Sequence, residues 1–329
     1  MEKRQLGTTN IFVNPIGLGC MGFSHAYGTA VEKNLAVKTI RSAYDVGYNF
    51  FDTAECYLGV NSDGSISNNE EIVGEALKDI RDKVVIATKF GVTHNPDRSL
   101  NLDSSPETIK KSIDGSLKRL QTDFVDLYYQ HRIDPNFEPE EIAEVMKELI
   151  KAGKIRAWGI SETNEEYLRR ANKICPVTAI QNRYSMAARW HENIFPVCEE
   201  LKISFIAFSP LANGLFAENY KNEQFEENDY RKKMPQFKES GLAKAQEAIN
   251  FLKKIAEEKK ATTAQISLAW MLCEKDYIIP IPGSRKIERL KENFASGEIK
   301  LSAEEISKIN AKLSTIDFEV FGGSKIVTK

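Results

Sequence analysis

The sequence predicts a (β/α)8 TIM barrel, in which eight parallel strands form a closed ring inside a layer of helices. Short apolar segments alternate along the chain with amphipathic ones, and this alternation is typical of parallel strands joined by helical crossovers. Eight such units are present, and the length of 329 residues suits a single barrel domain over residues 1–329. Open doubly wound sheets share this local pattern and stay the alternative fold.

The expected strands are rich in β-branched and aromatic residues and lack a clean alternation of apolar and polar positions. Strands that are buried on both faces have this composition. They are expected at residues 16–18, 48–51, 84–87, 125–129, 155–160, 177–180, 203–208 and 277–281.

Two of the helices between these strands have recognisable ends. Ser105 and Pro106 predict the start of one helix, because a serine side chain caps a first turn and proline fits within it. The following helix is expected from near Pro139 to Gly153, since glycine commonly ends a helix.

Some parts of the chain fall outside the repeated units. Residues 3–13 predict an N-terminal β-hairpin that covers the floor of the barrel. Residues 212–239 and the tail beyond Leu313 lack periodicity, so we expect long loops at the C-terminal face of the barrel. A helical run at residues 242–258 follows the first of these loops, and the next helix begins near Thr262.

Composition excludes several classes of protein. The 45 basic and 47 acidic residues give a net charge of −2, which leaves no field to hold nucleic acid or an anionic membrane. No apolar run reaches the roughly 18 residues of a membrane span, and the N-terminus lacks the apolar region of a signal peptide. The five scattered cysteines indicate a reducing, cytoplasmic location without a disulfide framework, and no metal site is expected. The oligomeric state stays open.

A glycine-rich segment near the N-terminus matches a dinucleotide fingerprint only in part. Gly17-Leu-Gly-Cys-Met-Gly22 has the G-x-G-x-x-G spacing, but helical periodicity begins only after Glu32, whereas the fingerprint must open a helix directly. We therefore expect a loop whose glycines allow close approach of a ligand to the backbone. Cys20 in this loop and Cys56 are expected near the reacting end of the cofactor.

Polar side chains stand at the C-terminal ends of three successive expected strands. Asp52, Lys89 and His131 each follow one of these strands, and Tyr57 lies in the loop after Asp52. In a parallel barrel such ends gather on one face, where active sites form. Each residue alone could be a capping or surface residue, but their common position on three strands favours a site.

These four side chains suit the reduction of a carbonyl group. The reaction needs a proton donor for the developing alkoxide beside the source of hydride. Tyr57 can supply the proton if the ammonium group of Lys89 lowers the tyrosine pKa, and Asp52 would hold that lysine charged and in place. His131 can donate a hydrogen bond to the carbonyl oxygen.

At these positions the sequence resembles the aldo-keto reductase superfamily, and the resemblance covers nearly the whole chain. Tyr48-Asn-Phe-Phe-Asp52-Thr-Ala-Glu-Cys-Tyr57 is similar to the family signature around its catalytic Asp and Tyr. Six further motifs follow in the order of the family: Thr88-Lys89-Phe90, Tyr129-Gln-His131-Arg132, Gly153-Lys-Ile-Arg-Ala-Trp-Gly-Ile-Ser161, Gln181-Asn-Arg-Tyr184-Ser, Phe208-Ser-Pro-Leu211 and Pro280-Ile-Pro-Gly283-Ser-Arg285.

The resemblance implies a catalytic tetrad and a nicotinamide cofactor, NADPH or NADP+. Asp52, Tyr57, Lys89 and His131 would form the tetrad, with Tyr57 as the general acid. By the same resemblance, Ser161 and Gln181 would hydrogen-bond the nicotinamide carboxamide, and Phe208 would stack on the nicotinamide ring. The pyrophosphate path would be lined by Ser209, Leu211 and Gly214, and the 2′-phosphate would be met by Ser284, Arg285 and Arg289. The adenine would be held by Glu292 and Asn293, and the cofactor would also be contacted by Pro210 and Gly283.

The sequence thus predicts NADPH-dependent reduction of small aldehydes and ketones to alcohols, with no nucleic-acid or membrane partner. A second interpretation is a cofactor-binding regulatory subunit, because the β subunits of potassium channels resemble the same family. A third is an open-sheet Rossmann dehydrogenase, which the position of the cofactor motifs late in the chain opposes.

Overall fold

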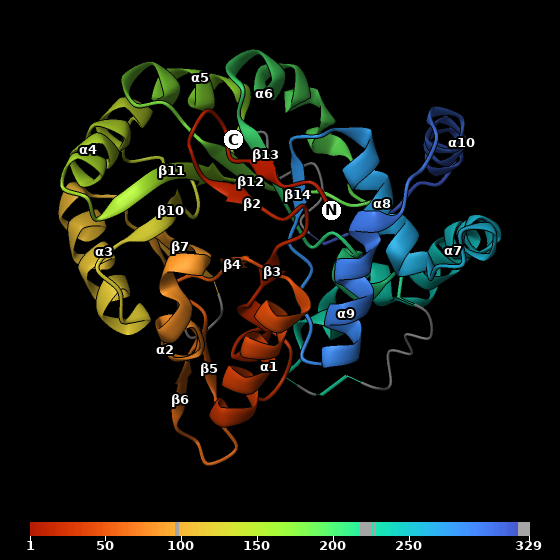
Figure 1. Cartoon of the computed structure of the whole chain (residues 1–329), viewed down its shortest axis with the longest axis horizontal. Coiled ribbons are helices and arrows are strands. Elements are labelled where there is room, and N and C mark those ends of the chain that lie inside the picture. The colour runs from red at the N-terminus through yellow and green to blue at the C-terminus, as the bar shows by residue number, and fades with distance from the viewer. Residues whose placement is uncertain (96–98, 218–224, 227, 322–329) are drawn as a thin grey trace.

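Eight parallel strands form the centre of the structure (Figure 1), a computed structural model that describes residues 1–95, 99–217, 225–226 and 228–321. Every neighbouring pair in the sheet is parallel, in the order in which the strands follow along the chain. The strands are β3 (Leu18–Gly19), β4 (Phe50–Asp52), β7 (Val85–Phe90), β10 (Val125–Gln130), β11 (Ile155–Ser161), β12 (Ala179–Arg183), β13 (Ser204–Phe208) and β14 (Ile278–Pro280). This arrangement confirms the (β/α)8 barrel.

Glycines at the seam bring the first strand to the last. The N–H of Gly17 donates to the carbonyl of Pro280 at 3.0 Å. A Cβ atom on Gly19 would lie 2.7 Å from the carbonyl oxygen of Ile281, and one on Gly283 would lie 2.6 Å from the carbonyl oxygen of Gly19. Because both contacts are to backbone atoms, a larger side chain at either position would push the two edges apart.

The glycine-rich segment therefore serves the closure of the barrel. Its last two residues begin a short 3-10 helix, η1 (Met21–Phe23), and the first α-helix begins only at Lys33. The partial dinucleotide fingerprint opens no α-helix, as expected. Gly17 and Gly19 lie against Pro280 and Ile281 at the last strand of the sheet. The sequence analysis had instead assigned these glycines to the close approach of a ligand.

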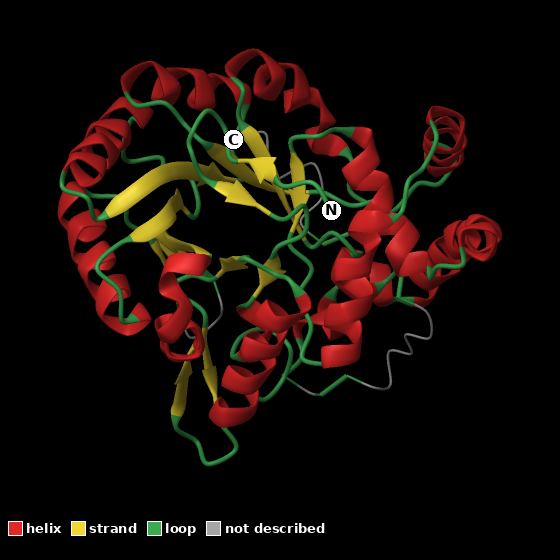
Figure 2. Cartoon of the chain, viewed as in Figure 1, coloured by secondary structure: helices red, strands yellow, loops and turns green. Residues whose placement is uncertain are grey.

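Helices surround the strands, and Figure 2 shows them as an outer layer. They are α1 (Lys33–Val46), α2 (Asn69–Leu77), α3 (Pro106–Leu120), α4 (Pro139–Lys151), α5 (Glu165–Ile174), α6 (Phe195–Leu201), α8 (Thr263–Glu274) and α9 (Ile287–Ala295). Two more helices, α7 (Glu239–Lys259) and α10 (Ala303–Leu313), lie to one side of this layer (Figure 1). The hydroxyl of Ser105 accepts a hydrogen bond from the N–H of Thr108, which confirms the expected cap of α3.

The N-terminal hairpin covers the floor of the barrel, as expected. Its strands β1 (Arg4–Gln5) and β2 (Phe12–Val13) pair antiparallel. Leu6, Ile11 and Val13 are buried against inward-facing residues of the barrel strands. Two further hairpins escaped the sequence analysis: β5 (Leu58–Val60) with β6 (Ile66–Asn68), and β8 (Val92–His94) with β9 (Leu100–Leu102).

The long segment after β13 is more ordered than its pattern predicts. It contains the 3-10 helices η4 (Ala212–Gly214), η6 (Tyr230–Lys233) and η7 (Pro235–Phe237). Residues 218–224 and 227, on which part of the predicted loop falls, lie outside the described residues. The N–H of Tyr230 donates to the carbonyl of Ala26 at 2.9 Å, so this segment packs beside the loop that follows β3.

The tail beyond Leu313 also contacts the rest of the fold. Ile316 and Val320 are buried, and the N–H of Phe321 donates to the side-chain amide of Gln236 at 2.9 Å. Residues 322–329 of this tail lie outside the described residues. In the part of the chain that the structure describes, each helix is too short or too polar to cross a bilayer.

Candidate active site

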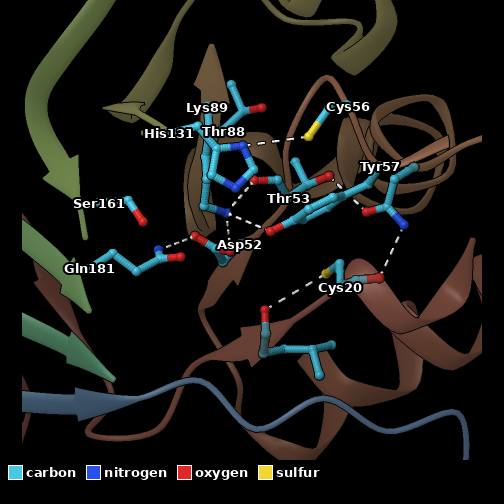
Figure 3. A network of polar contacts seen from close by, with 12 residues as sticks. Cys20, Asp52, Thr53, Cys56, Tyr57, Thr88, Lys89, His131, Ser161 and Gln181 are labelled. Atoms are coloured by element: carbon cyan, nitrogen blue, oxygen red, sulfur yellow. Dashed lines mark hydrogen bonds and ion pairs between the residues drawn. The ribbon is translucent and has the colours of Figure 1, made fainter. Parts of the chain in front are cut away.

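The three residues predicted at strand ends and Tyr57 lie together (Figure 3). Asp52 is the last residue of β4, Lys89 lies one residue before the end of β7, and His131 directly follows β10. The register pairs Asp52 with Ala87 and Tyr129 with Lys89, so neighbouring strands bring these positions to the same end of the barrel. Tyr57 reaches them from the loop between β4 and β5.

Lys89 is the centre of this group. Its side chain is fully buried, and its Nζ donates to Oδ1 of Asp52 at 2.5 Å, to the carbonyl of Thr53 at 2.7 Å and to Oη of Tyr57 at 3.4 Å. Burial alone would lower the pKa of the lysine, but Asp52 and Tyr57 raise the pKa above its ordinary value. The ammonium group therefore stays charged, with its three donors directed at three oxygens.

Tyr57 presents a phenol whose pKa differs from the prediction. Burial raises the pKa to about 12, and the opposing effect of Lys89 only limits this rise. Lys89 lowers the tyrosine pKa, as expected, but desolvation of the phenolate outweighs this one neighbouring charge, so the pKa lies above its ordinary value. Tyr57 is a protonated phenol at neutral pH, with a cation beside the oxygen that would lose the proton.

His131 contacts Cys56 through Nδ1 of its imidazole ring. Sγ of Cys56 lies 3.4 Å from Nδ1 of the imidazole, and the rings of His131 and Tyr57 meet edge to face with their centroids 5.7 Å apart (Figure 3). Burial, and then the charges of Arg132 and Lys89, lower the pKa of His131 well below its usual value. The imidazole is therefore neutral, and it carries one proton to donate. Cys56 thus lies directly beside one of the four predicted residues.

The two residues expected at the nicotinamide carboxamide are neighbours in the sheet. Ser161 and Gln181 are paired in the register of β11 and β12, and both are buried. Nε2 of Gln181 donates to Oδ2 of Asp52 at 2.7 Å, while Oγ of Ser161 accepts a hydrogen bond from Arg132 at 3.2 Å. The structure thus joins Gln181 to the tetrad directly.

The residues expected along the pyrophosphate follow β13. Phe208 ends this strand, and the guanidinium carbon of Arg183 lies 4.9 Å from the centre of its ring. Ser209, Ala212 and Asn213 have φ between +49° and +63°, and Gly214 has φ of +100°. Pro210 and Leu211 lie between them. These left-handed residues turn the chain sharply across the end of the barrel.

The two arginines expected at the 2′-phosphate lie on either side of the start of α9. Arg285 precedes α9, and its Nε donates to the carbonyl of Gly22 at 2.6 Å. Arg289 lies on α9, exposed, in an ion pair with Glu292. Of these two arginines, Arg285 alone has a buried nitrogen, Nη2, without a hydrogen-bond partner among the described residues.

The remaining expected cofactor residues lie before α9 and in its C-terminal half. Ser284 accepts a hydrogen bond from the N–H of Lys286 at 3.1 Å, and Gly283 lies at the seam of the barrel. Glu292 also accepts from the hydroxyl of Thr262 at 2.7 Å, and Asn293 is buried. The carboxylate of Glu292 therefore already has two partners.

Asn69, at the start of α2, was missed by the sequence analysis. Its N–H donates to the carbonyl of Tyr57 at 3.2 Å, and Oγ of Ser24 donates to the same carbonyl at 2.8 Å. Its side chain accepts from the hydroxyl of Thr53 and donates to Ser24 and to the carbonyl of Cys20. Asn69 thus fixes the loop that carries Tyr57. In the sequence it resembles the exposed polar start of any helix, so no local signal marks it.

The buried acid Glu70 was also missed by the sequence analysis, because it too resembles the exposed polar start of a helix. Glu70 is fully buried, and it accepts hydrogen bonds from the hydroxyl of Thr88 at 2.5 Å and from Nε of Arg119 at 2.6 Å. These partners lie on β7 and α3, far from Glu70 in sequence. They hold the strand that presents Lys89 against α2. Across the described residues, no group of His, Cys, Asp or Glu side chains is placed to bind a metal ion.

Comparisons with known proteins agree with this geometry. A model of the Aldo/keto reductase family matches residues 15–314. A probable aldo-keto reductase 1 of Glycine max is 36% identical over 311 residues, which are 94% of this chain and 88% of that protein. The aldo-keto reductase yakc [NADP(+)] of Schizosaccharomyces pombe is 36% identical over an alignment of 340 residues, which spans 99% of this chain and 97% of that protein.

Solved structures have the same fold. A glycerol dehydrogenase from Gluconobacter oxydans superposes with a TM-score of 0.83 at 26% identity, with 95% of each chain covered. An aldo-keto reductase from Klebsiella pneumoniae, solved in complex with NADPH, superposes with a TM-score of 0.72 at 25% identity, with 97% of this chain and 99% of that chain covered.

Proposed function

This chain belongs to the aldo/keto reductase family, and we propose that it reduces small aldehydes and ketones to alcohols with NADPH, using Tyr57 as the general acid. Its membership makes it an NAD(P)H-dependent oxidoreductase. The observation that carries the proposal is the position of Lys89, whose Nζ lies 2.5 Å from Asp52 and 3.4 Å from the phenolic oxygen of Tyr57.

The cofactor is NADP(H), and the residues of this chain fit it. The buried Nη2 of Arg285 lacks a partner among the described residues, and a guanidinium with a spare donor suits a phosphate group. Arg285 would hold the 2′-phosphate, while Ser161 and Gln181 would hold the carboxamide at the other end. When bound, the cofactor supplies the hydride that reduces the carbonyl carbon.

Tyr57 and Lys89 act on the proton. With a pKa of about 12, the phenol keeps its proton at neutral pH until negative charge develops on the carbonyl oxygen. The charged ammonium of Lys89 then stabilises the phenolate that the transfer leaves behind. Asp52 balances the charge of the lysine and fixes its position, because an unpaired ammonium in this buried place would be costly.

His131 orients the carbonyl oxygen. Burial raises the pKa of the Cys56 thiol to about 12, so the sulfur keeps its proton and can donate it to Nδ1 of the imidazole. The single proton of the neutral ring then lies on Nε2, on the side away from Cys56. That N–H can donate to the substrate oxygen that Tyr57 protonates.

An assay of cofactor oxidation tests this function. Purified protein and NADPH should consume members of a panel of aldehydes and ketones, with one alcohol formed for each NADPH oxidised. Tight binding of NADPH with no turnover of any carbonyl compound would contradict the proposal, and it is the result expected of a regulatory subunit.

A further inference from the structure

Arg132 places a positive charge directly beside the reacting groups. It follows His131 in the sequence, and its Nη1 donates to Oγ of Ser161 at 3.2 Å and to the carbonyl of His131. Its side chain is only half-buried. The guanidinium therefore lies at the C-terminal end of the barrel, next to the residue expected to orient the substrate oxygen.

This guanidinium has no carboxylate partner among the residues that the structure describes, and this distinguishes it from most of the chain's arginines. Those that form ion pairs are Arg81, Arg119, Arg156, Arg169, Arg170, Arg189, Arg231 and Arg289. An arginine whose guanidinium forms no ion pair can bind an anion from solution.

Two acids that stand next to Arg132 or to its partner Ser161 in the chain already have other partners: Asp134, two residues after Arg132, and Glu162, directly after Ser161. Glu162 accepts a hydrogen bond from the N–H of Arg183 at 2.8 Å and lies 3.6 Å from Nε2 of His191. Asp134 accepts from the N–H of Ser104 at 2.9 Å and from Asn136. Glu162 and Arg132 attract each other electrostatically, but neither acid forms an ion pair with Arg132 in the part of the chain that the structure describes.

The charged and titratable groups that act on His131 are all basic: Arg132, Lys89, His94 and His25. Asp52 balances Lys89 through the 2.5 Å contact. Arg132 is attracted by Glu162 but forms no ion pair among the described residues, so its guanidinium can take a further anionic partner beside His131.

We infer that Arg132 recognises a carboxylate on the substrate, so that the preferred substrates are aldehydes and ketones that carry an anionic group on the same small molecule. This inference rests on the proposed function. The carboxamide expected at Ser161 is neutral and needs no guanidinium, and the phosphate expected on the cofactor lies at Arg285. A charge-assisted hydrogen bond in a half-buried site contributes roughly a ten-fold preference or more.

The test compares two aldehydes that differ mainly in charge, 4-carboxybenzaldehyde and its methyl ester. We expect kcat/KM to favour the carboxylate at least about ten-fold, and the preference to shrink as salt rises. Arg132→Gln should abolish the preference and Arg132→Lys should keep part of it. The ratio of the two substrates is the readout, so a uniform loss of activity cancels. Arg169→Gln, which removes the same charge from the outer face of α5, should leave the ratio unchanged.

A binding measurement separates this inference from the proposed function. Calorimetry in the presence of NADP+ should show that 4-(hydroxymethyl)benzoate binds more tightly than its methyl ester, and that Arg132→Gln removes the difference. Equal affinities, or a carboxylate preference that survives in Arg132→Gln, would overturn the inference even if the enzyme reduces neutral aldehydes well. If the preference is present in binding and neither aldehyde is reduced, the inference holds and the proposed function fails.

Discussion

The ammonium nitrogen of Lys89 lies 3.4 Å from the phenolic oxygen of Tyr57, and hydrogen bonds to buried residues fix the position of each residue. Asp52 and the carbonyl of Thr53 take the other two donors of the lysine. Asn69 fixes the backbone of Tyr57. The proton donor and the cation that stabilises its phenolate are therefore in place before substrate binds, which is the arrangement that lowers a barrier most effectively.

Replacement of Lys89 by methionine should lower kcat for aldehyde reduction by about 100-fold or more, the usual contribution of an assisted proton transfer. The neutral side chain cannot stabilise the tyrosinate. Because Asp52 would be left buried without its partner, far-UV circular dichroism and thermal unfolding must accompany the kinetics. A folded Lys89→Met enzyme with unchanged turnover and an unaltered pH profile would contradict the coupling.

The pH dependence follows from two opposite pKa shifts. Burial raises the pKa of Tyr57 to about 12 and lowers the pKa of His131 well below its usual value. The required forms, protonated phenol and neutral imidazole, therefore coexist over the whole neutral range. With saturating NADPH, kcat for reduction should be flat from about pH 7 to about pH 10 and should fall as pH approaches the tyrosine pKa. An ionisation centred near about pH 8 in this profile would contradict the assignment.

The contact of Cys56 with His131 should fix the imidazole tautomer. Nitrogen-15 NMR of the histidines should place the His131 proton on Nε2 in the wild type and in Cys56→Ser, which keeps a donor. Cys56→Ala should relax this preference and lower kcat by up to about ten-fold, the effect of one neutral hydrogen bond. A wild-type His131 with its proton on Nδ1 would show that the sulfur accepts, and the proposed role of the imidazole would fail.

We expect Arg285 to contribute more than Arg289 to the preference for NADPH over NADH. Arg285→Ala should weaken NADPH binding by about ten- to a hundred-fold and barely change NADH binding, because only NADPH carries the 2′-phosphate. Arg289→Ala should have a smaller effect, since this side chain is exposed and already paired with Glu292. Fluorescence titration of both cofactors measures this. Parallel losses for NADH and NADPH would mean that Arg285 serves the fold through its contact with Gly22.

The sequence predicts the barrel and the clustering of Asp52, Lys89 and His131 well because both follow from strand order. Successive strands place Asp52, Lys89 and His131 at one end, and parallel pairing then brings them together without knowledge of distances. The N-terminal hairpin and the start of α3 carry local signals that short-range chemistry can interpret.

The parts that escaped the sequence analysis depend on contacts between distant segments. Asn69 and Glu70 have the composition of an exposed helix start, yet α2 packs so that both are buried. The phenol pKa of Tyr57 depends on how completely the fold excludes water, which composition does not record. Arg285 and Arg289 are both expected at the 2′-phosphate, but α9 begins between them, and this boundary gives them different surroundings. Each of these features depends on burial or on an element boundary set by tertiary packing.

The central claim, that Tyr57 is the general acid, is tested most directly by Tyr57→Phe. Removal of the hydroxyl should lower kcat for aldehyde reduction by about 100- to 10,000-fold, while the Kd for NADPH stays within about three-fold of the wild type. Tyr128→Phe is the matched control, because its hydroxyl is buried, has no hydrogen-bond partner among the described residues and should be dispensable. Rapid kinetics of NADPH oxidation, with NADPH affinity measured by fluorescence, gives both numbers. A Tyr57→Phe enzyme that reduces aldehydes at the wild-type rate would remove Tyr57 from the role of acid.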